Sequence, residues 1–365
     1  LEELQDWIPR QSGSAYRTMV FVSGGSEAME SALKLALQYH SARGAESRRR
    51  FIARRRSWHG NTLGALSISD FAARRTPFEG ALVPASFVGS VNAYRLPDGV
   101  GPTELVAYAA RELEEEILRI DPSRVAAFVL EPIVGAAGCV IPPPAGYLQA
   151  VHDICRRHGV LLIADEVMCG AGRTGYWRAL EPEGVEADIF AVAKGLAGGY
   201  VPLGAAICSN EIAAVLEQDG GILTGHTFTG HTLACAAGVA VQTIIDRDGL
   251  LNRIRVRGAQ LLQDLRDTLE SIDAVGDIRG RGYFIGIEFV ADRSSREPFP
   301  SDAQISQKVA RAAADAGLLI YPTGGNVDGV RGDGLILAPP YNATDTELDE
   351  LCALTAQAIR ATLTP

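Results

Sequence analysis

The sequence predicts an α/β protein with a mostly parallel sheet flanked by helices, followed by a smaller α+β C-terminal domain. Two observations lead to this fold class. Between Met19 and Ser209, short runs of continuously apolar residues alternate with helical patterns, which is typical of buried parallel strands. After Asp246 the order changes to long helices around a strand-like segment, which is typical of an α+β unit.

Six short apolar runs are predicted to form the strands of the large sheet. Helical patterns at residues 27–40, 104–120 and 146–158 lie between them. Because each run is apolar throughout rather than alternating, we expect helices to cover both faces of the sheet. The predicted strands are residues 20–22, 51–53, 126–130, 160–164, 189–193 and 204–208.

The C-terminal part has longer helical patterns. It is predicted to contain helices at residues 250–272, 301–317 and 344–362, with one strand at residues 280–289. The change of pattern divides the chain into three parts. These are an N-terminal segment at residues 1–16, a large domain at residues 17–245 and a small C-terminal domain at residues 246–365.

The composition is that of a globular protein, with 47% hydrophobic and 21% charged residues. A net charge of −10 argues against a nucleic-acid partner, because phosphate backbones are bound by basic surfaces. The basic run formed by Arg48–Arg50 and Arg54–Arg56 is interpreted as a solvated surface. A phosphate-binding patch is the less favoured alternative.

The six cysteines show no CxxC spacing, and most of them lie in apolar runs. Such cysteines behave as free buried thiols in a reducing compartment. No apolar stretch is long enough to span a bilayer, and the N-terminus has no signal-peptide pattern. The sequence therefore predicts a cytoplasmic protein without a membrane partner.

Lysine is scarce, and Lys34, Lys194 and Lys308 are the three in the chain. Lys194 ends an apolar run and is followed by glycine, at the edge where open α/β sheets bind ligands. Desolvation there lowers the pKa of a lysine and frees its amine to form an imine with an aldehyde. Lys34 and Lys308 are interpreted as residues of solvated helix faces.

A glycine-rich turn follows the first predicted strand and leads directly into a helix. Its glycines, Gly24 and Gly25, let the backbone approach a ligand, and a helix N-terminus attracts anions. The turn is thus a candidate phosphate cradle, although its spacing is that of neither a P-loop nor a dinucleotide fingerprint. The alternative is an ordinary turn in which Ser26 is the N-cap of the helix.

Three further strand ends carry unusual residues. Trp58 offers a ring that could stack on a planar cofactor, although a core tryptophan beside a satisfied His59 is the commoner arrangement. Glu131 ends one apolar strand, and Asp165 with Glu166 ends the next. Buried acids need a partner or a function. Here they indicate an anchor for a cationic ring nitrogen. Metal ligands are the less favoured alternative, because no histidine or third acid is close in sequence.

A phosphate cradle, a stacking ring, a buried aspartate and a lysine at an apolar strand end are together the parts of a pyridoxal-phosphate (PLP) site. The combination is far more specific than any of its members. The sequence therefore predicts an enzyme that holds PLP as a Schiff base on Lys194.

These segments, in this order, resemble the class III aminotransferases, which are PLP enzymes of fold type I. The resemblance extends from Phe21 to Tyr341. It is most specific at residues 23–28, 58–62, 165–175 and 194–204.

The resemblance implies catalytic roles for three residues. Lys194 would hold the cofactor and move a proton between the substrate Cα and the cofactor. Asp165 would pair with the protonated pyridine nitrogen, and Glu131 would support Asp165.

The resemblance also implies four cofactor contacts. Gly25 and Ser26 would hold the phosphate. Trp58, at a position that is usually Tyr or Phe in the family, would stack on one face of the ring, and Val167 would pack on the other.

The segment 225–231 resembles the family's phosphate-binding loop that a neighbouring subunit contributes, so Thr227 would reach the partner's phosphate in a homodimer. Arg331 lies near the family's substrate-carboxylate arginine, where the local spacing is looser.

The sequence departs from the family in three respects. Met168 stands where ornithine- and GABA-type members have a glutamine, and Ala136 stands where they have a glutamate that pairs with the carboxylate arginine. Both changes resemble the amine or β-alanine–pyruvate subgroup. Relatives also have an N-terminal arm ahead of the position of Leu1, which we expect to be absent, cleaved or disordered here.

The resemblance implies a homodimeric transaminase with ping-pong chemistry. It would take an amino group from an amine or amino acid and pass it to a keto acid or aldehyde. A decarboxylating transaminase, an aminomutase or an epimerase would share the same cofactor residues. A non-catalytic PLP-binding regulator is the remote alternative, and no helix-turn-helix segment favours it.

Overall fold

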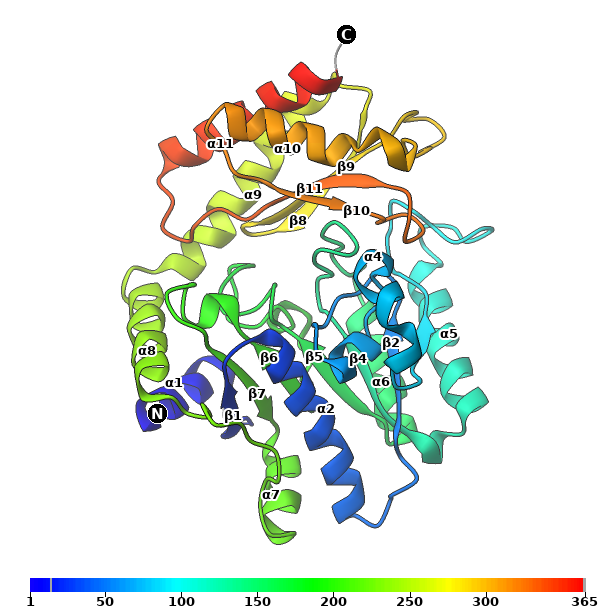
Figure 1. The fold of residues 1–365 in the computed structure, drawn as a ribbon, viewed down its shortest axis with the longest axis vertical. Helices are drawn as coiled ribbons and strands as arrows, with labels where there is room; N and C mark the ends of the chain where they lie inside the picture. Colours follow the sequence, from blue (N-terminus) through cyan, green and yellow to red (C-terminus); the bar gives the residue numbers. More distant parts are fainter. Residues whose placement is uncertain (14, 364–365) are drawn as a thin grey trace.

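The computed structural model describes residues 1–13 and 15–363. A seven-stranded sheet forms the large part of the molecule, and a four-stranded sheet lies above it in Figure 1. Among the strands of the large sheet, β7 runs antiparallel to its two neighbours and the others share one direction. The strands, in their order across the sheet, are β1 (Thr18–Val22), β7 (Gly204–Cys208), β6 (Ile189–Val192), β5 (Leu161–Asp165), β4 (Val125–Leu130), β2 (Arg50–Arg54) and β3 (Ser86–Val88).

The predicted, mostly parallel sheet is confirmed, and its central strands are buried on both faces. Successive residues contribute to different cores: Phe128 and Leu162 pack in one cluster, whereas Val129 and Ile163 pack in the other. This is why these strands are continuously apolar. The three predicted helices between them are α2 (Gly25–Ala42), on the side of the second cluster, and α5 (Leu105–Ile120) and α6 (Tyr147–His158), on the side of the first.

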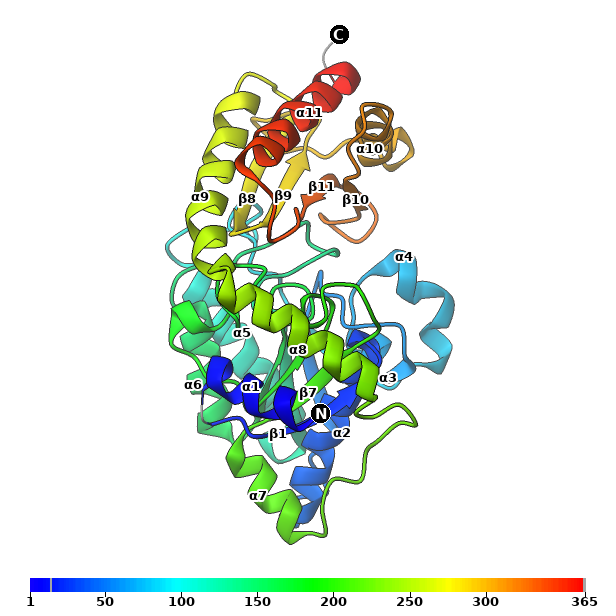
Figure 2. The ribbon, with the colours of Figure 1, turned by 90° about the vertical axis from the view of Figure 1, so that its left-hand side faces the viewer.

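The remaining elements of the large part are shorter or lie at its edges. Figure 2 shows α1 (Glu2–Ser12) beside α8 (Thr232–Arg247), and the two helices are in contact. The others are α3 (Leu63–Ser67), α4 (Ala72–Arg75), α7 (Asn210–Gln218), and the 3-10 helices η1 (Thr76–Ala81), η2 (Pro122–Arg124), η3 (Glu181–Glu183) and η4 (Lys194–Leu196).

The small sheet is fully antiparallel and carries its helices on the side away from the large sheet (Figure 1). A third hydrophobic cluster lies between this sheet and those helices. The elements are β10 (Tyr321–Gly324), β11 (Asp333–Leu337), β9 (Phe284–Phe289) and β8 (Val275–Arg281), with η5 (Ser301–Ala303), α9 (Leu250–Leu269), α10 (Ile305–Asp315) and α11 (Asp345–Leu363).

The single strand predicted at residues 280–289 is wrong. The chain reverses there and forms the hairpin of β8 and β9, with Arg281 paired to Phe284. Gly282 makes the reversal, because its φ of 59° is left-handed and a Cβ would collide with the backbone of Thr174. The predicted division between residues 245 and 246 falls inside the last turn of α8 and stays a prediction.

A buried ion network joins the small sheet to the large part. Glu288 of β9 is fully buried and pairs with Arg279, 2.7 Å away, and with Arg95 from the loop after β3. Arg279 also donates hydrogen bonds to the carbonyl oxygens of Val140 and Gly138, at 2.8 and 3.0 Å. Because several partners share the buried charge, the two parts of the molecule are held together by more than apolar packing.

Within the described residues, no helix has both the length and the apolar character needed to cross a membrane.

Candidate active site

Lys194 lies two residues after the end of β6, at the start of η4, and adopts a conformation that is unusual for a residue with a side chain. Its φ of 44° lies in the left-handed region, which is strained for a non-glycine residue. The next residue must be small, because a Cβ on Gly195 would lie 2.6 Å from the hydroxyl of Tyr341. The chain therefore tolerates local strain at the residue that the sequence singled out.

Lys194 is exposed to solvent, although protein atoms surround its amine. Burial is the largest influence on its pKa and lowers it, whereas the nearby carboxylates of Asp165 and Glu131 oppose that shift. A lowered pKa makes the neutral, nucleophilic amine more abundant near neutral pH.

Asp165 ends β5, the strand beside β6, where its backbone pairs with Ala191. One carboxylate oxygen lies 2.7 Å from Nδ1 of His59, and the other accepts a hydrogen bond from the backbone N–H of Val167 at 3.0 Å. Both Asp165 and His59 are buried. These contacts fix the orientation of the carboxylate at the strand end next to the one that carries Lys194.

Sequence reasoning missed His59 as a site residue. It was interpreted as a satisfied core histidine beside Trp58, yet its Nε2 is buried without a hydrogen-bond partner among the described residues. His59 follows the end of β2 by five residues, and β2 is parallel to β4 and hence to β5. Its place after this strand is the signal that could have put it at the same sheet edge as Asp165.

The carboxylate of Glu131 is hydrogen-bonded to backbone groups of two neighbouring loops. Its carboxylate accepts hydrogen bonds from the backbone N–H groups of Trp58 at 3.0 Å and Gly135 at 2.7 Å. Burial raises the pKa of Glu131; the charge of His59 opposes this shift and the charge of Asp165 adds to it. The carboxylate thus links the end of β4 to the end of β2.

Glu166, the second acid of the pair after β5, faces away from this cluster. Its two oxygens accept hydrogen bonds from the backbone N–H groups of Ala179 at 2.7 Å and Leu180 at 3.2 Å. Burial raises the pKa of Glu166 to about 7. Its contacts fasten the loop at residues 166–180.

The predicted phosphate cradle is shaped by close approaches of backbone and side chains. A Cβ on Gly25, the first residue of α2, would lie 2.7 Å from a methyl group of Val167. The hydroxyl of Ser26 accepts a hydrogen bond from the backbone N–H of Asn61 at 3.0 Å. Ser26 lies inside the helix and Gly24 is its N-cap, so the alternative role of Ser26 as N-cap is wrong.

Trp58 lies half-buried under aromatic and cationic neighbours. Phe71 packs edge-on against its ring at 5.9 Å between ring centres, and the Cζ atom of Arg74 lies 4.9 Å from the centre of the ring.

Met168, one of the departures from the family pattern, packs against Gly135 beside Glu131. Ala136, the other, accepts a hydrogen bond from the hydroxyl of Thr323 in β10.

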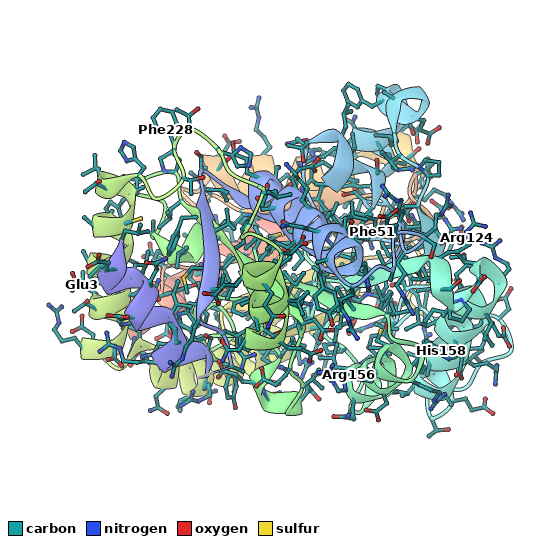
Figure 3. All side chains as sticks on the ribbon, turned by 90° about the horizontal axis from the view of Figure 1, so that it is seen from below. Glu3, Phe51, Arg124, Arg156, His158 and Phe228 are labelled. Carbon is teal, nitrogen blue, oxygen red and sulfur yellow. The ribbon has the colours of Figure 1, made fainter. Side chains whose placement is uncertain are left out.

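Two predicted site residues lie apart from this cluster. Thr227 is exposed in the loop before α8, and Figure 3 shows its neighbour Phe228 at the outer edge of the molecule. Arg331 lies in the connection from β10 to β11 and is already paired with Asp328 at 2.7 Å and Glu297 at 3.1 Å. Within one chain, the described contacts of these two residues do not include Lys194 or Asp165.

Known proteins resemble this chain along nearly its whole length. An uncharacterized aminotransferase from Schizosaccharomyces pombe is 40% identical over 99% of this chain and 80% of the relative. The structure of an amine transaminase from an uncultivated Pseudomonas species, in a PLP-bound form, is 35% identical with a TM-score of 0.90, covering 99% of this chain and 80% of the other. The structure of a thermostable (S)-enantioselective omega-transaminase from Thermomicrobium roseum is 34% identical with a TM-score of 0.91, covering 99% and 78%.

The family model for class-III aminotransferases matches residues 1–359. This match, together with the similar structures, confirms the predicted fold type I architecture, the predicted aminotransferase activity and PLP as the cofactor. The chain belongs to the class-III aminotransferase family.

Proposed function

We propose that this enzyme takes an amino group from an amine or an α- or ω-amino acid and passes it to a keto acid or aldehyde in two half-reactions. The observation that carries the proposal is the placement of Lys194 and Asp165 at the ends of the neighbouring strands β6 and β5. The similar structures described as amine and omega-transaminases support an amine-type donor.

The residues of the site fit the cofactor. When bound, PLP supplies an electron sink that stabilises negative charge at the substrate Cα. Lys194 would bind its aldehyde carbon and then carry a proton on Nζ between the substrate Cα and the cofactor. Asp165, held by His59 and by the N–H of Val167, would keep the pyridine nitrogen protonated. Glu131 would hold the backbone of Trp58 in place.

The remaining contacts would orient the cofactor. The first turn of α2, at Gly25 and Ser26, would bind the phosphate, because the N–H groups at a helix N-terminus attract anions. Val167 packs directly over Gly25, so the phosphate cradle lies next to the face of the ring site that Val167 would cover. Trp58 would cover the opposite face.

A panel of donors and acceptors tests the proposed reaction. A productive donor, added alone to the holoenzyme, should abolish the visible absorbance of the lysine-bound cofactor, and pyruvate or 2-oxoglutarate should restore it while the new amino acid forms. Release of CO₂, a rearranged amino acid or an inverted stereocentre without nitrogen transfer would instead identify the decarboxylating, mutase or epimerase alternatives.

We propose further that two chains share their active sites in a homodimer. Large apolar side chains gather around the loop before α8: Leu223 is 79% exposed, Phe228 61% and Leu233 66%. Phe228 and Leu233 line a hollow of about 390 Å³ together with Val201 and Leu203. An exposed apolar surface of this kind is expected to be covered by another chain. Thr227 lies on this surface and would reach the partner's phosphate.

Subunit mixing tests the shared site. A Thr227→Ala variant should bind PLP more weakly, and Lys194→Ala should be inactive. Heterodimers of the two should regain one complete site, made by Lys194 of one subunit and Thr227 of the other, and therefore recover cofactor affinity and activity. If subunit exchange is verified by mass spectrometry and neither recovers, Thr227 does not act across the interface.

We also propose a cytoplasmic location. It is supported by the six cysteines, all of which are free and buried, as is usual in a reducing compartment.

A further inference from the structure

Tyr341 reaches from the small part of the molecule to the backbone beside Lys194. It lies in the connection from β11 to α11 and packs against the third hydrophobic cluster. A Cβ on Gly195 would lie 2.6 Å from the Tyr341 hydroxyl, and a Cβ on Gly172 would lie 3.2 Å from a carbon of its ring. The tyrosine therefore occupies the space that these two glycines leave open.

Arg173 holds the Tyr341 ring in this place. The Cζ atom of Arg173 lies 4.5 Å from the centre of the ring. The same guanidinium donates hydrogen bonds to the carbonyl oxygens of Pro339 at 2.6 Å and Tyr283 at 3.2 Å, both of which belong to the small part. The contact with the ring face and these two hydrogen bonds fix the tyrosine against the loop that carries Gly172.

The backbone after Lys194 is also restrained by α8. The side-chain amide of Gln242 donates hydrogen bonds to the carbonyl oxygens of Gly195 at 3.1 Å and Leu196 at 2.9 Å. Gln242 is fully buried, and its own carbonyl accepts a hydrogen bond from the indole of Trp177 at 3.0 Å. The short helix η4 is thus tied to α8, while Tyr341 closes the space beside it.

These contacts surround two residues in strained conformations. Lys194 has a φ of 44°, and Ala171, whose carbonyl oxygen would lie 3.2 Å from a Cβ on Gly195, has a φ of 49°. Residues with side chains persist in left-handed conformations only where their surroundings leave no relaxed alternative. Tyr341 belongs to these surroundings, because its hydroxyl lies against the residue that follows Lys194.

We propose that Tyr341 is a positioning residue for Lys194. By filling the space beside Gly195, it keeps the backbone of Lys194 in the left-handed conformation that presents the amine to the aldehyde of the cofactor. The proposal rests on the proposed role of Lys194 and adds to it a contact from the small part of the molecule. The position of the small part thereby influences the reactivity of the lysine.

Titration of the holoenzyme with methylamine compares Lys194 with a free amine. Methylamine takes the place of the lysine nitrogen on the cofactor and releases the lysine as a free amine. Borohydride reduction followed by mass spectrometry measures the cofactor that is left on Lys194. In Tyr341→Ala, half-displacement should need about tenfold less methylamine, because the advantage of the lysine over a free amine is its fixed orientation.

The total cofactor retained after ultrafiltration should not change in Tyr341→Ala, since the phosphate cradle is unaffected. Tyr108→Ala is the matched control: Tyr108 also lies beneath an arginine, Arg111, but in α5. It should require the same methylamine concentration as the wild type.

A pair of substitutions tests the contact itself. Gly195→Ala should lower the unfolding temperature and the methylamine concentration for half-displacement, because its methyl group meets the Tyr341 hydroxyl. Adding Tyr341→Phe should restore most of both losses, since the next atom, the carbonyl oxygen of Ala171, lies 3.2 Å away. Tyr341→Phe alone should behave like the wild type. Gly80→Ala, whose Cβ would meet no atom within 4 Å, is the control.

Unchanged displacement in Tyr341→Ala, or a loss of total bound cofactor as large as the change in displacement, would overturn the proposal. A double variant that behaves like Gly195→Ala would show that Tyr341 does not limit the backbone beside Lys194. If borohydride fixes no cofactor on Lys194 in the wild type, the proposed role of the lysine fails, whereas recovery of the unfolding temperature in the double variant still reports on the Tyr341 contact.

Discussion

Replacing Lys194 with alanine is expected to abolish turnover and the visible absorbance of the lysine-bound cofactor. The substitution removes both the nucleophile that holds the cofactor and the group that moves the proton, so the rate should fall by more than about 10⁴-fold. Cofactor should still bind through the first turn of α2, with lower affinity, because Gly25 and Ser26 are unaffected.

Absorbance spectra, steady-state rates and bound cofactor after ultrafiltration check this prediction. Lys308→Ala is the matched control, because it removes a lysine from α10 of the small part and should change none of the three. A Lys194→Ala enzyme with wild-type activity and an unchanged visible band would remove Lys194 from the mechanism.

Replacing Asp165 with asparagine is expected to slow removal of the substrate Cα proton by about 10²- to 10³-fold. A neutral amide no longer favours a protonated pyridine nitrogen, and the stabilisation of the developing negative charge depends on that proton. Asparagine has the same shape, and its carbonyl oxygen can still accept the hydrogen bond from the N–H of Val167. The fold should therefore persist, as circular dichroism and thermal unfolding would show.

Stopped-flow spectroscopy with a deuterated donor isolates the proton-transfer step. Glu166→Gln provides the contrast, because this neighbouring buried acid holds the backbone at Ala179 and Leu180. It should lower the unfolding temperature more than the rate of proton transfer in the folded enzyme. Proton transfer at the wild-type rate in Asp165→Asn would show that the pairing with the ring nitrogen is wrong.

Continuous apolar strands and scarce residue types are the features that the sequence displays most clearly. Lys194 stands out because the chain has two other lysines and neither ends an apolar strand. Six of the seven strands of the large sheet are recognisable because both of their faces are buried, which leaves no alternating pattern to confuse with a helix. β3 went unpredicted, since three residues carry too little periodicity.

Contacts between distant segments were harder to predict. The partnership of His59 with Asp165 joins residues 106 positions apart, and a lone histidine beside a tryptophan gives no sign of it. Arg331 was chosen by its motif, whose looser spacing could not reveal the nearby acids Asp328 and Glu297.

The buried charges of Arg95, Arg279 and Glu288 also limit how this enzyme can be recombined with its relatives. A chimaera that takes residues 246–365 from this chain inherits Glu288 and Arg279 but receives the position of Arg95, and the carbonyl groups of Gly138 and Val140, from the other parent. Without an arginine at that position, Glu288 loses one of its two cationic partners, and breaking a buried pair costs about 3–5 kcal/mol. Productive crossovers should keep these segments from a single parent, so the small part is inherited together with the loop after β3 rather than as an independent module.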